Sequence, residues 1–319
     1  MRLHIVHETR YRYVPAVKTA QHMAHLRPLE LPHQRVLSHA LRIEPAPQQQ
    51  TEARDAYGNT RAFFSLQSAH HALVVVADSL VETRAPAPAP ADQPWEQVRE
   101  RMRYEAGAPY EPAAEFVFTS PYAPRHDSFA DYARPCFTPG LGLLKGAQAL
   151  MTRIHTECVY DGDSTEVNTP ALEALAQRRG VCQDFAHIMV ACCRSLGLPA
   201  RYVSGYLLTE PPPGQPRLVG ADASHAWASV WLPTAPGLGQ WIDFDPTNNR
   251  QPGEDYVTVA TGRDYADVSP IRGVIHGGAD HTLTVNVTVA PYDAAPQSQS
   301  QSQSQSQSQS QSQSQNATD

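Results

Sequence analysis

Alternation of polar and apolar residues over the first 85 positions predicts a set of β-strands. Four stretches carry this pattern: residues 3–14, 36–47, 60–66 and 71–84. Successive side chains of a strand point to opposite faces, so this alternation is typical of a sheet with one buried face. The sequence DAYGNT, with Gly58 and Asn59, supplies turn residues just before the third stretch. We therefore expect a small antiparallel β-rich domain over residues 1–84.

The proline-rich segment APAPAPADQP, residues 85–94, interrupts this pattern and predicts a linker. Helical spacing of apolar residues begins after it, and strand-like runs follow. The expected helices are residues 95–105, 142–157, 169–180 and 182–197, and the expected strands are residues 200–208, 225–233, 239–247 and 282–289. The mixture predicts an α+β unit over residues 95–292, closed by its last strand.

The C-terminal segment, residues 293–319, is dominated by a strict Gln-Ser alternation over 297–315. This alternation contains no apolar residue whose burial could offset the entropy of ordering the chain. We expect a disordered tail outside the fold.

Composition and charge exclude several function classes. Hydrophobic residues make up 41% and charged residues 18% of the chain, which is typical of a globular protein. The net charge is −7 and no long Lys/Arg run occurs, so we expect no nucleic-acid partner. The longest apolar run, residues 72–77, is too short to cross a bilayer, and the first residues show no signal peptide. We therefore expect a cytoplasmic protein that does not bind membranes.

The cysteines and histidines do not indicate a disulfide framework or a metal site. Five cysteines are irregularly spaced, which favours free thiols. Fourteen histidines are present, but HMAH (22–25) and the pair at 70–71 lack further ligands at suitable spacing. We expect no metal and no cofactor, and the sequence leaves the oligomeric state open.

The stretch RRGVCQDFAH places Cys182 at the start of the predicted helix 182–197. The first turn of a helix offers free N–H groups and the positive end of the macrodipole, which favour a thiolate and could bind an oxyanion. Cys192 and Cys193 lie further along the helix and are expected in the core. Position alone leaves two interpretations of Cys182 open, a nucleophile or a buried core residue.

Two residues downstream could complete a nucleophilic site. His225 stands at the start of the strand-like run SHAWASVWLP, and Asp245 ends the next run, WIDFDPTN. Adjacent antiparallel strands would bring them together. Cysteine, histidine and aspartate then match the logic of nucleophile, base and orienting carboxylate.

These motifs together resemble the bacterial transglutaminase-like superfamily. RGVCQDFAH, ARYVSGYL, SHAWASVWLP and WIDFDPTN are similar to its core, and YRYVPAV, LRPLE and DAYGNTRAFFSL to the β-rich domain that precedes it. The resemblance implies a papain-like, transglutaminase-like α+β core, with an antiparallel sheet packed on the nucleophile helix. It also implies a Cys-His-Asp triad of Cys182, His225 and Asp245.

The resemblance also draws attention to residues around the triad. Gln183 and Asp184 follow the cysteine in CQD, and Asp184 has either a helix-capping or a supporting role. Tyr206 and Trp227 are similar to pocket-wall residues, with packing favoured over chemistry. Ser229 is a departure, because members often carry an acid there.

The implied reaction is acyl transfer from a peptide, isopeptide or glutamine amide through a thioester. We expect hydrolysis, as in a cysteine peptidase or amidase, on a peptide or protein substrate. Transfer to an amine by a protein-glutamine gamma-glutamyltransferase is the alternative, although no acidic calcium loop like those of animal cross-linkers is evident. A non-catalytic binding or scaffold module is a further alternative.

Overall fold

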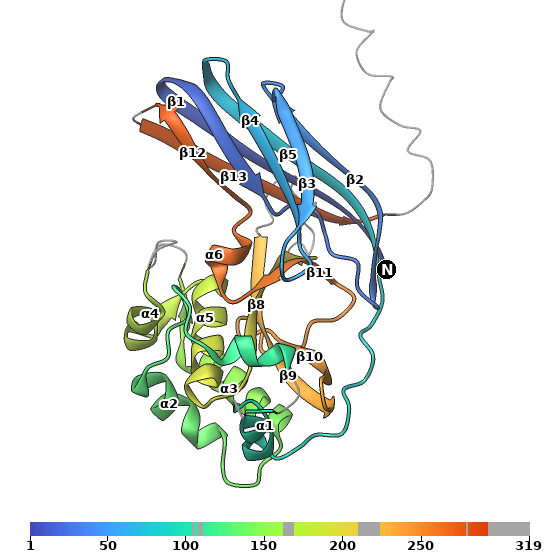
Figure 1. The fold of residues 1–319 in the computed structure, drawn as a ribbon, viewed down its shortest axis with the longest axis vertical. Coiled ribbons are helices and arrows are strands. Elements are labelled where there is room, and N and C mark those ends of the chain that lie inside the picture. The colour runs from blue at the N-terminus through green and yellow to red at the C-terminus, as the bar shows by residue number, and fades with distance from the viewer. Residues whose placement is uncertain (104–105, 108–110, 162–168, 210–223, 279, 293–319) are drawn as a thin grey trace, which may run out of the picture.

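The computed structural model shows a curled antiparallel β-sheet joined to an α+β core (Figure 1). It describes residues 1–103, 106–107, 111–161, 169–209, 224–278 and 280–292. The Gln-Ser tail, for which we expect disorder, lies outside these described residues. None of the described helices is long and apolar enough to cross a membrane.

One long strand, β1 (Arg2–Ala24), organises the N-terminal sheet. The same sheet contains β2 (Gln34–Glu44), β3 (Gln49–Arg54), β4 (Thr60–Leu66) and β5 (His70–Thr83), in the order β2-β5-β1-β4-β3. The first half of β1 pairs with β5 and the second half with β4, with a register shift between Arg12 and Val17. The predicted turn is present between β3 and β4, where Gly58 has φ +84°, a conformation that favours glycine.

Two strands from the end of the described chain complete this sheet. They are β12 (Ile271–Gly277) and β13 (Asp280–Pro291), and both pair with β1. The sequence predicts that the strand over 282–289 closes the core, and that assignment is wrong. The twelve-residue register from Leu3↔Pro291 to Val14↔Asp280 places it in the N-terminal sheet, because β1 has an otherwise open edge there.

The core contains a second antiparallel sheet with helices packed on it. Its strands are β8 (Ala200–Leu207), β9 (Ser224–Ala235), β10 (Leu238–Phe244) and β11 (Tyr256–Gly262), in the order β10-β9-β8-β11. The helices are α1 (Trp95–Arg101), η1 (Pro112–Val117), α2 (Asp127–Ala133), η2 (Arg134–Cys136), α3 (Leu143–Glu157), α4 (Ala171–Gln177), α5 (Cys182–Ser195) and α6 (Tyr265–Val268). A short parallel pair, β6 (Val159–Tyr160) and β7 (Arg179–Gly180), precedes α5. The predicted fold class is confirmed.

Helix α5 is buried almost throughout and packs against β8 and β9. Its apolar side chains belong to a large cluster with residues from α2, α3, β9 and β10, which includes Ile188, Leu150 and Val230. Burial of each such side chain stabilises the fold by about 1.5–3 kcal/mol. The helix that begins with Cys182 is therefore a rigid support rather than a surface element.

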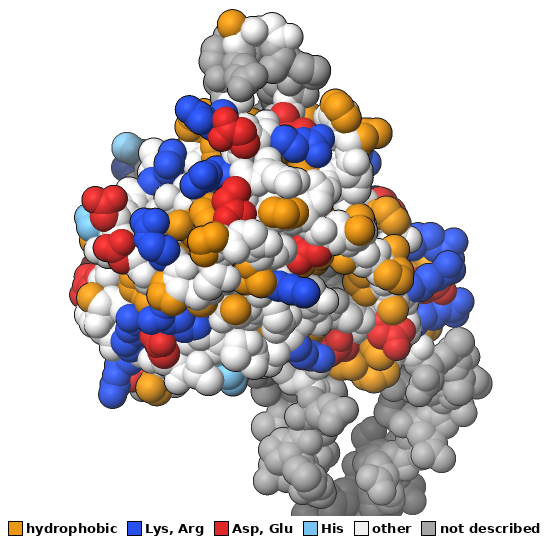
Figure 2. Space-filling view, turned by 90° about the horizontal axis from the view of Figure 1, so that it is seen from below, with side chains coloured by type: hydrophobic (Ala, Val, Ile, Leu, Met, Phe, Trp, Pro, Cys, Tyr) orange, Lys and Arg blue, Asp and Glu red, His pale blue; other side chains and the backbone are white. Residues whose placement is uncertain are grey.

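A shared apolar cluster joins the N-terminal sheet to the core. It contains Ile5, Val81 and Val287 from the sheet, together with Ala186 and Tyr206 from the core, and Cys182 packs against its edge. The N-terminal sheet thus contributes to the surroundings of Cys182. At the opposite, helical end of the core, basic and acidic side chains are mixed over the face that Figure 2 shows.

Candidate active site

Cys182 is the first residue of α5. The first hydrogen bond of the helix runs from Phe185 N to Val181 O (3.1 Å), so the N–H of Cys182 precedes the helical ladder. Asp184 Oδ2 accepts a hydrogen bond from Val181 N at 2.8 Å and closes the first turn. Cys182 is half-buried, whereas the other four cysteines are buried. Its thiol therefore combines access with the positive end of a helix.

Steric crowding explains why the residue two positions before Cys182, Gly180, is a glycine. A Cβ atom at Gly180 would lie 2.6 Å from Asp184 Oδ2 and 2.7 Å from Asp184 Cβ. The carboxylate that closes the first turn thus occupies the space that a larger residue would need. A glycine two positions before Cys182 follows from the capping role of Asp184, which the sequence left as one of two interpretations.

His225 and Asp245 come from neighbouring strands of the core sheet. His225 lies near the start of β9, and Asp245 directly follows β10. His225 Nε2 lies 2.7 Å from Asp245 Oδ2. The Cys182 side chain lies close enough to the imidazole to contribute to its pKa. The structure therefore brings the three residues singled out by the sequence together at one site, where a hydrogen bond joins His225 to Asp245.

The carboxylate of Asp245 accepts five hydrogen bonds from described residues. Its Oδ2 atom accepts from His225, from Tyr256 Oη (2.7 Å) and from Asn248 Nδ2 (2.7 Å). Its Oδ1 atom accepts from the backbone N–H groups of Thr247 (2.9 Å) and Asn248 (3.2 Å). Burial alone would raise the pKa of this carboxyl, but the hydrogen bonds and the charge of His225 outweigh it and lower the pKa. Asp245 is thus a fixed carboxylate.

The sequence reasoning missed Asn248 and Tyr256. Asn248 follows Asp245 by three residues, and the turn-forming DPTNN sequence could have indicated it. Tyr256 comes from β11, whose register against β8 is set by the fold, so no local signal pointed to it.

The environment of His225 favours the protonated ring. Burial disfavours the imidazolium, but the hydrogen bonds and charges of Asp245 and Cys182 outweigh burial and raise the pKa of His225 to about 9. The side chain of His225 is 10% exposed and that of Asp245 is fully buried, so water screens the pair weakly. The arrangement therefore stabilises an imidazolium next to the Cys182 side chain.

Two family models match this chain. Residues 3–82 match the bacterial transglutaminase-like N-terminal region, and residues 128–246 match the transglutaminase-like superfamily core. Cys182, His225 and Asp245 all fall within the second match. An uncharacterized protein of Mycobacterium tuberculosis is 41% identical over 92% of this chain and 93% of its own length.

The chain belongs to the transglutaminase-like superfamily.

Further relatives of this transglutaminase-like protein differ in sequence identity and in the share of each chain that aligns. An uncharacterized protein of Mycobacterium leprae is 30% identical over 90% of this chain and 98% of its own length. A protein-glutamine gamma-glutamyltransferase of Pseudomonas aeruginosa is 38% identical, over only 22% of this chain and 10% of its own length. The crystal structure of a "Putative Cysteine Protease" from Cytophaga hutchinsonii has a TM-score of 0.69 and 22% identity, with 93% of each chain covered. That likeness shows a common fold.

The other residues that the sequence singled out occupy different parts of the transglutaminase-like core. Gln183 is half-buried beside Cys182. Trp227 is fully buried, with its ring 6.0 Å from that of His225, so it packs behind the imidazole. Tyr206 bonds through its hydroxyl to His7 Nδ1 (2.9 Å) and packs at the junction with the N-terminal sheet. Ser229, the departure from the family pattern, is fully buried.

The remaining cysteines have environments that disfavour a thiolate. Burial raises the pKa of Cys193 to about 12, and it raises the pKa of Cys192 well above its usual range. Burial also raises the pKa of the Cys136 and Cys158 thiols. These four residues are therefore expected to be poor nucleophiles.

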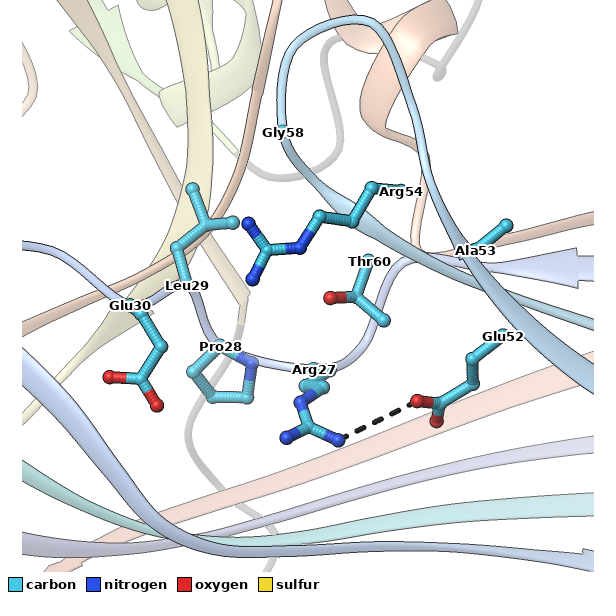
Figure 3. Close-up of a pocket in the computed structure, with 9 residues that line it drawn as sticks. All are labelled: Arg27, Pro28, Leu29, Glu30, Glu52, Ala53, Arg54, Gly58 and Thr60. Atoms are coloured by element: carbon cyan, nitrogen blue, oxygen red, sulfur yellow. Dashed lines mark ion pairs between the residues drawn. The ribbon is translucent and has the colours of Figure 1, made fainter.

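A separate pocket of about 350 Å³ lies between the segment after β1 and the β3–β4 hairpin (Figure 3). Its lining residues are Arg27, Pro28, Leu29, Glu30, Glu52, Ala53, Arg54, Gly58 and Thr60. Arg27 and Glu52 form an ion pair at 3.5 Å across its lower side in the view of Figure 3. The pocket shares no residue with the Cys182 site, and we assign it no part in the chemistry. Among the described residues, no three His, Cys, Asp or Glu side chains cluster as a metal ion would require.

Proposed function

We propose that the protein is a cysteine enzyme that catalyses acyl transfer with Cys182, His225 and Asp245 as its triad. The observation that carries the proposal is the hydrogen-bonded His225–Asp245 pair beside the partly exposed Cys182 thiol. Each member has the environment that its role needs. The thiol is accessible at a helix start, the imidazole has a raised pKa, and the carboxylate is buried and fixed.

The proposed reaction proceeds through a thioester. The Cys182 thiolate attacks an amide carbonyl, and the N–H of Cys182 donates a hydrogen bond to the oxyanion that forms. The His225 imidazolium then protonates the leaving amine, and the C–N bond breaks. Asp245 keeps the ring oriented and stabilises its positive charge. In the second half, neutral His225 takes a proton from water, which attacks the thioester and releases the acid.

We propose hydrolysis of a peptide or isopeptide bond as the main activity, because Cys182 is half-exposed and water can reach the thioester. Transfer to an amine is the second candidate. It is favoured by the similarity of 71 residues to the Pseudomonas aeruginosa protein-glutamine gamma-glutamyltransferase.

One assay separates the two activities. The protein is incubated with a glutamine-containing peptide and a labelled primary amine, and deamidated and amine-linked products are quantified by mass spectrometry. We expect the deamidated product to dominate and Cys182→Ala to abolish both products. Amine incorporation that exceeds hydrolysis would overturn the preference for water. Turnover by Cys182→Ala would overturn the mechanism.

A non-catalytic binding module is the third candidate. It predicts that Cys182 reacts with electrophiles no faster than a buried structural cysteine. The environments of the five thiols favour the enzyme instead, because Cys182 is the one that is partly exposed and lies beside the His225 imidazole.

A further inference from the structure

The short strand β6 lies beside Cys182. It pairs with β7, and Tyr160 stands opposite Gly180, two residues before Cys182. The Tyr160 ring meets the ring of Phe185, in the first turn of α5, edge-on at 6.4 Å. Burial, and after it the nearby Cys182 thiol, raise the pKa of Tyr160. Tyr160 is therefore an immediate neighbour of the proposed nucleophile.

Among the described residues, β7 is the only strand that pairs with β6, so the outer edge of β6 has no partner strand there. Val159 N donates to Arg178 O (2.9 Å) and Asp161 N donates to Gly180 O (3.0 Å). In a parallel pair with these bonds, the N–H and C=O of the intervening Tyr160 point away from the partner strand. No hydrogen bond joins either group to the described part of the chain. Val159 and Tyr160 are 56% and 58% exposed, respectively.

We propose that the acyl-donor substrate is an extended peptide segment that docks on this edge and pairs with the backbone of Tyr160. The proposal rests on the proposed function and names its substrate class. One donor and one acceptor on the same residue match the C=O and N–H of one residue in an extended chain. The exposed Tyr160 ring adds an apolar surface for a substrate side chain.

The position of the outer edge of β6 favours an extended peptide as the ligand. Tyr160 lies across the β6–β7 ladder from Gly180, and the chain continues from Gly180 directly to Cys182. A strand docked on Tyr160 therefore lies along the approach to the thiol. A small amide without flanking peptide would gain none of these backbone bonds. The site thus favours a glutamine or peptide bond within a polypeptide over a free amide.

The test compares two alkylating reagents on Cys182. One is the capped peptide reagent acetyl-Ala-Ala-Ala chloromethyl ketone, and the other is iodoacetamide, which has no peptide chain. The variant Tyr160→Pro removes the outward N–H, a group that the β6–β7 ladder does not use, and proline suits an open strand edge. The matched variant Tyr160→Ala removes the ring and keeps the N–H.

We expect the ratio of the peptide-reagent rate to the iodoacetamide rate to fall about tenfold in Tyr160→Pro, as for loss of one hydrogen bond. Tyr160→Ala should lower the ratio less. The wild-type protein gives an independent check that does not depend on folding of a variant. Three further peptide reagents each carry a methyl group on the backbone nitrogen of one alanine. The reagent whose methylated nitrogen would otherwise donate to Tyr160 O should modify Cys182 about tenfold more slowly than the parent reagent.

An unchanged ratio in Tyr160→Pro, or equal rates for all three N-methylated reagents and the parent, would overturn the docking proposal. Neither result would affect the triad. If iodoacetamide fails to modify Cys182 selectively in the wild-type protein, the proposed function fails, and the docking proposal falls with it.

Discussion

At the scale of single residues, the character of Cys182 depends on where its side chain lies rather than on its identity. Cys192 and Cys193 stand on the same helix, but burial raises the pKa of both thiols. Cys182 alone is half-exposed, and it lies beside an imidazole that Asp245 orients. The difference follows from one helix start and two strand ends that meet at a single point.

The hydroxyl of Tyr256 should matter for the reaction although it does not touch the thiol. It donates to Asp245 Oδ2 at 2.7 Å, so Tyr256→Phe leaves a buried carboxylate with one donor fewer. We expect the rate of Cys182 acylation to fall about tenfold, with substrate affinity unchanged. Tyr132→Phe is the matched control, since the buried Tyr132 hydroxyl has no hydrogen-bond partner within the described chain. Equal rates in the two variants would show that Tyr256 does not position Asp245.

The raised pKa of His225 predicts a pH dependence of stability. The native ring keeps its proton up to about pH 9, whereas the ring in the unfolded chain loses it near pH 6.5. The stabilisation is therefore complete below pH 6.5 and is lost as the pH rises through 9. We expect the urea midpoint of the wild-type protein to fall over this range more steeply than that of Asp245→Asn. Parallel pH profiles of the two proteins would contradict this account.

The sequence alone allowed Cys182, His225 and Asp245 to be identified, because each lies in a local motif at the start or end of a predicted helix or strand. It could not reach Tyr256, whose contact with Asp245 arises from the pairing of β11 with β8. It also missed β3, since every residue of this edge strand is exposed and no apolar alternation marks it.

At the scale of elements, two side-chain amides close the outer edge of β11. Gln34 donates to Thr258 O (2.7 Å) and accepts from Thr258 N (2.8 Å). Asn59 bonds in the same way to the O and N atoms of Thr261, both at 2.8 Å. Each amide thus replaces one residue of a neighbouring strand. The N-terminal sheet protects this edge of the core with side chains instead of a further strand.

Replacement of one amide by a carboxylate tests this arrangement. Asn59→Asp keeps an acceptor for Thr261 N but loses the donor to Thr261 O, and it places a second carboxylate beside Asp55. We expect the free energy of unfolding to fall by about 3 kcal/mol in urea denaturation. The control Gln50→Glu makes the same chemical change on the exposed strand β3 and should cost less than about 0.5 kcal/mol. Equal losses would refute a specific role for the amide.

At the scale of the whole molecule, the last described strand pairs with the first. Strand β13 pairs with β1 over twelve residues and buries Val287 and Val289 in the cluster that joins the sheet to the core. The local sequence carries no signal for such a long-range pairing. Alternation of polar and apolar residues therefore predicted the strand but not its partner strand. The same cluster reaches Cys182, which makes the N-terminal sheet part of the site's support.

Two C-terminal truncations distinguish the contribution of β13 to stability from that of the Gln-Ser tail. A chain that ends at residue 278 loses β13 and exposes the first half of β1, so we expect it to aggregate or to lack a cooperative thermal transition. A chain that ends at residue 292 loses only the Gln-Ser segment and should keep the full-length midpoint in circular dichroism. A cooperative transition in the shorter chain would contradict the role given to β13.

The reactivity of the five cysteines in the native protein tests the central claim most directly. The protein is treated with limiting iodoacetamide at pH 7, and each cysteine-containing peptide is quantified by mass spectrometry. We predict that Cys182 reacts at least tenfold faster than any other cysteine and that His225→Ala removes this advantage. Labelling of Cys182 no faster than that of Cys136 or Cys158, or an unchanged rate in His225→Ala, would contradict the account.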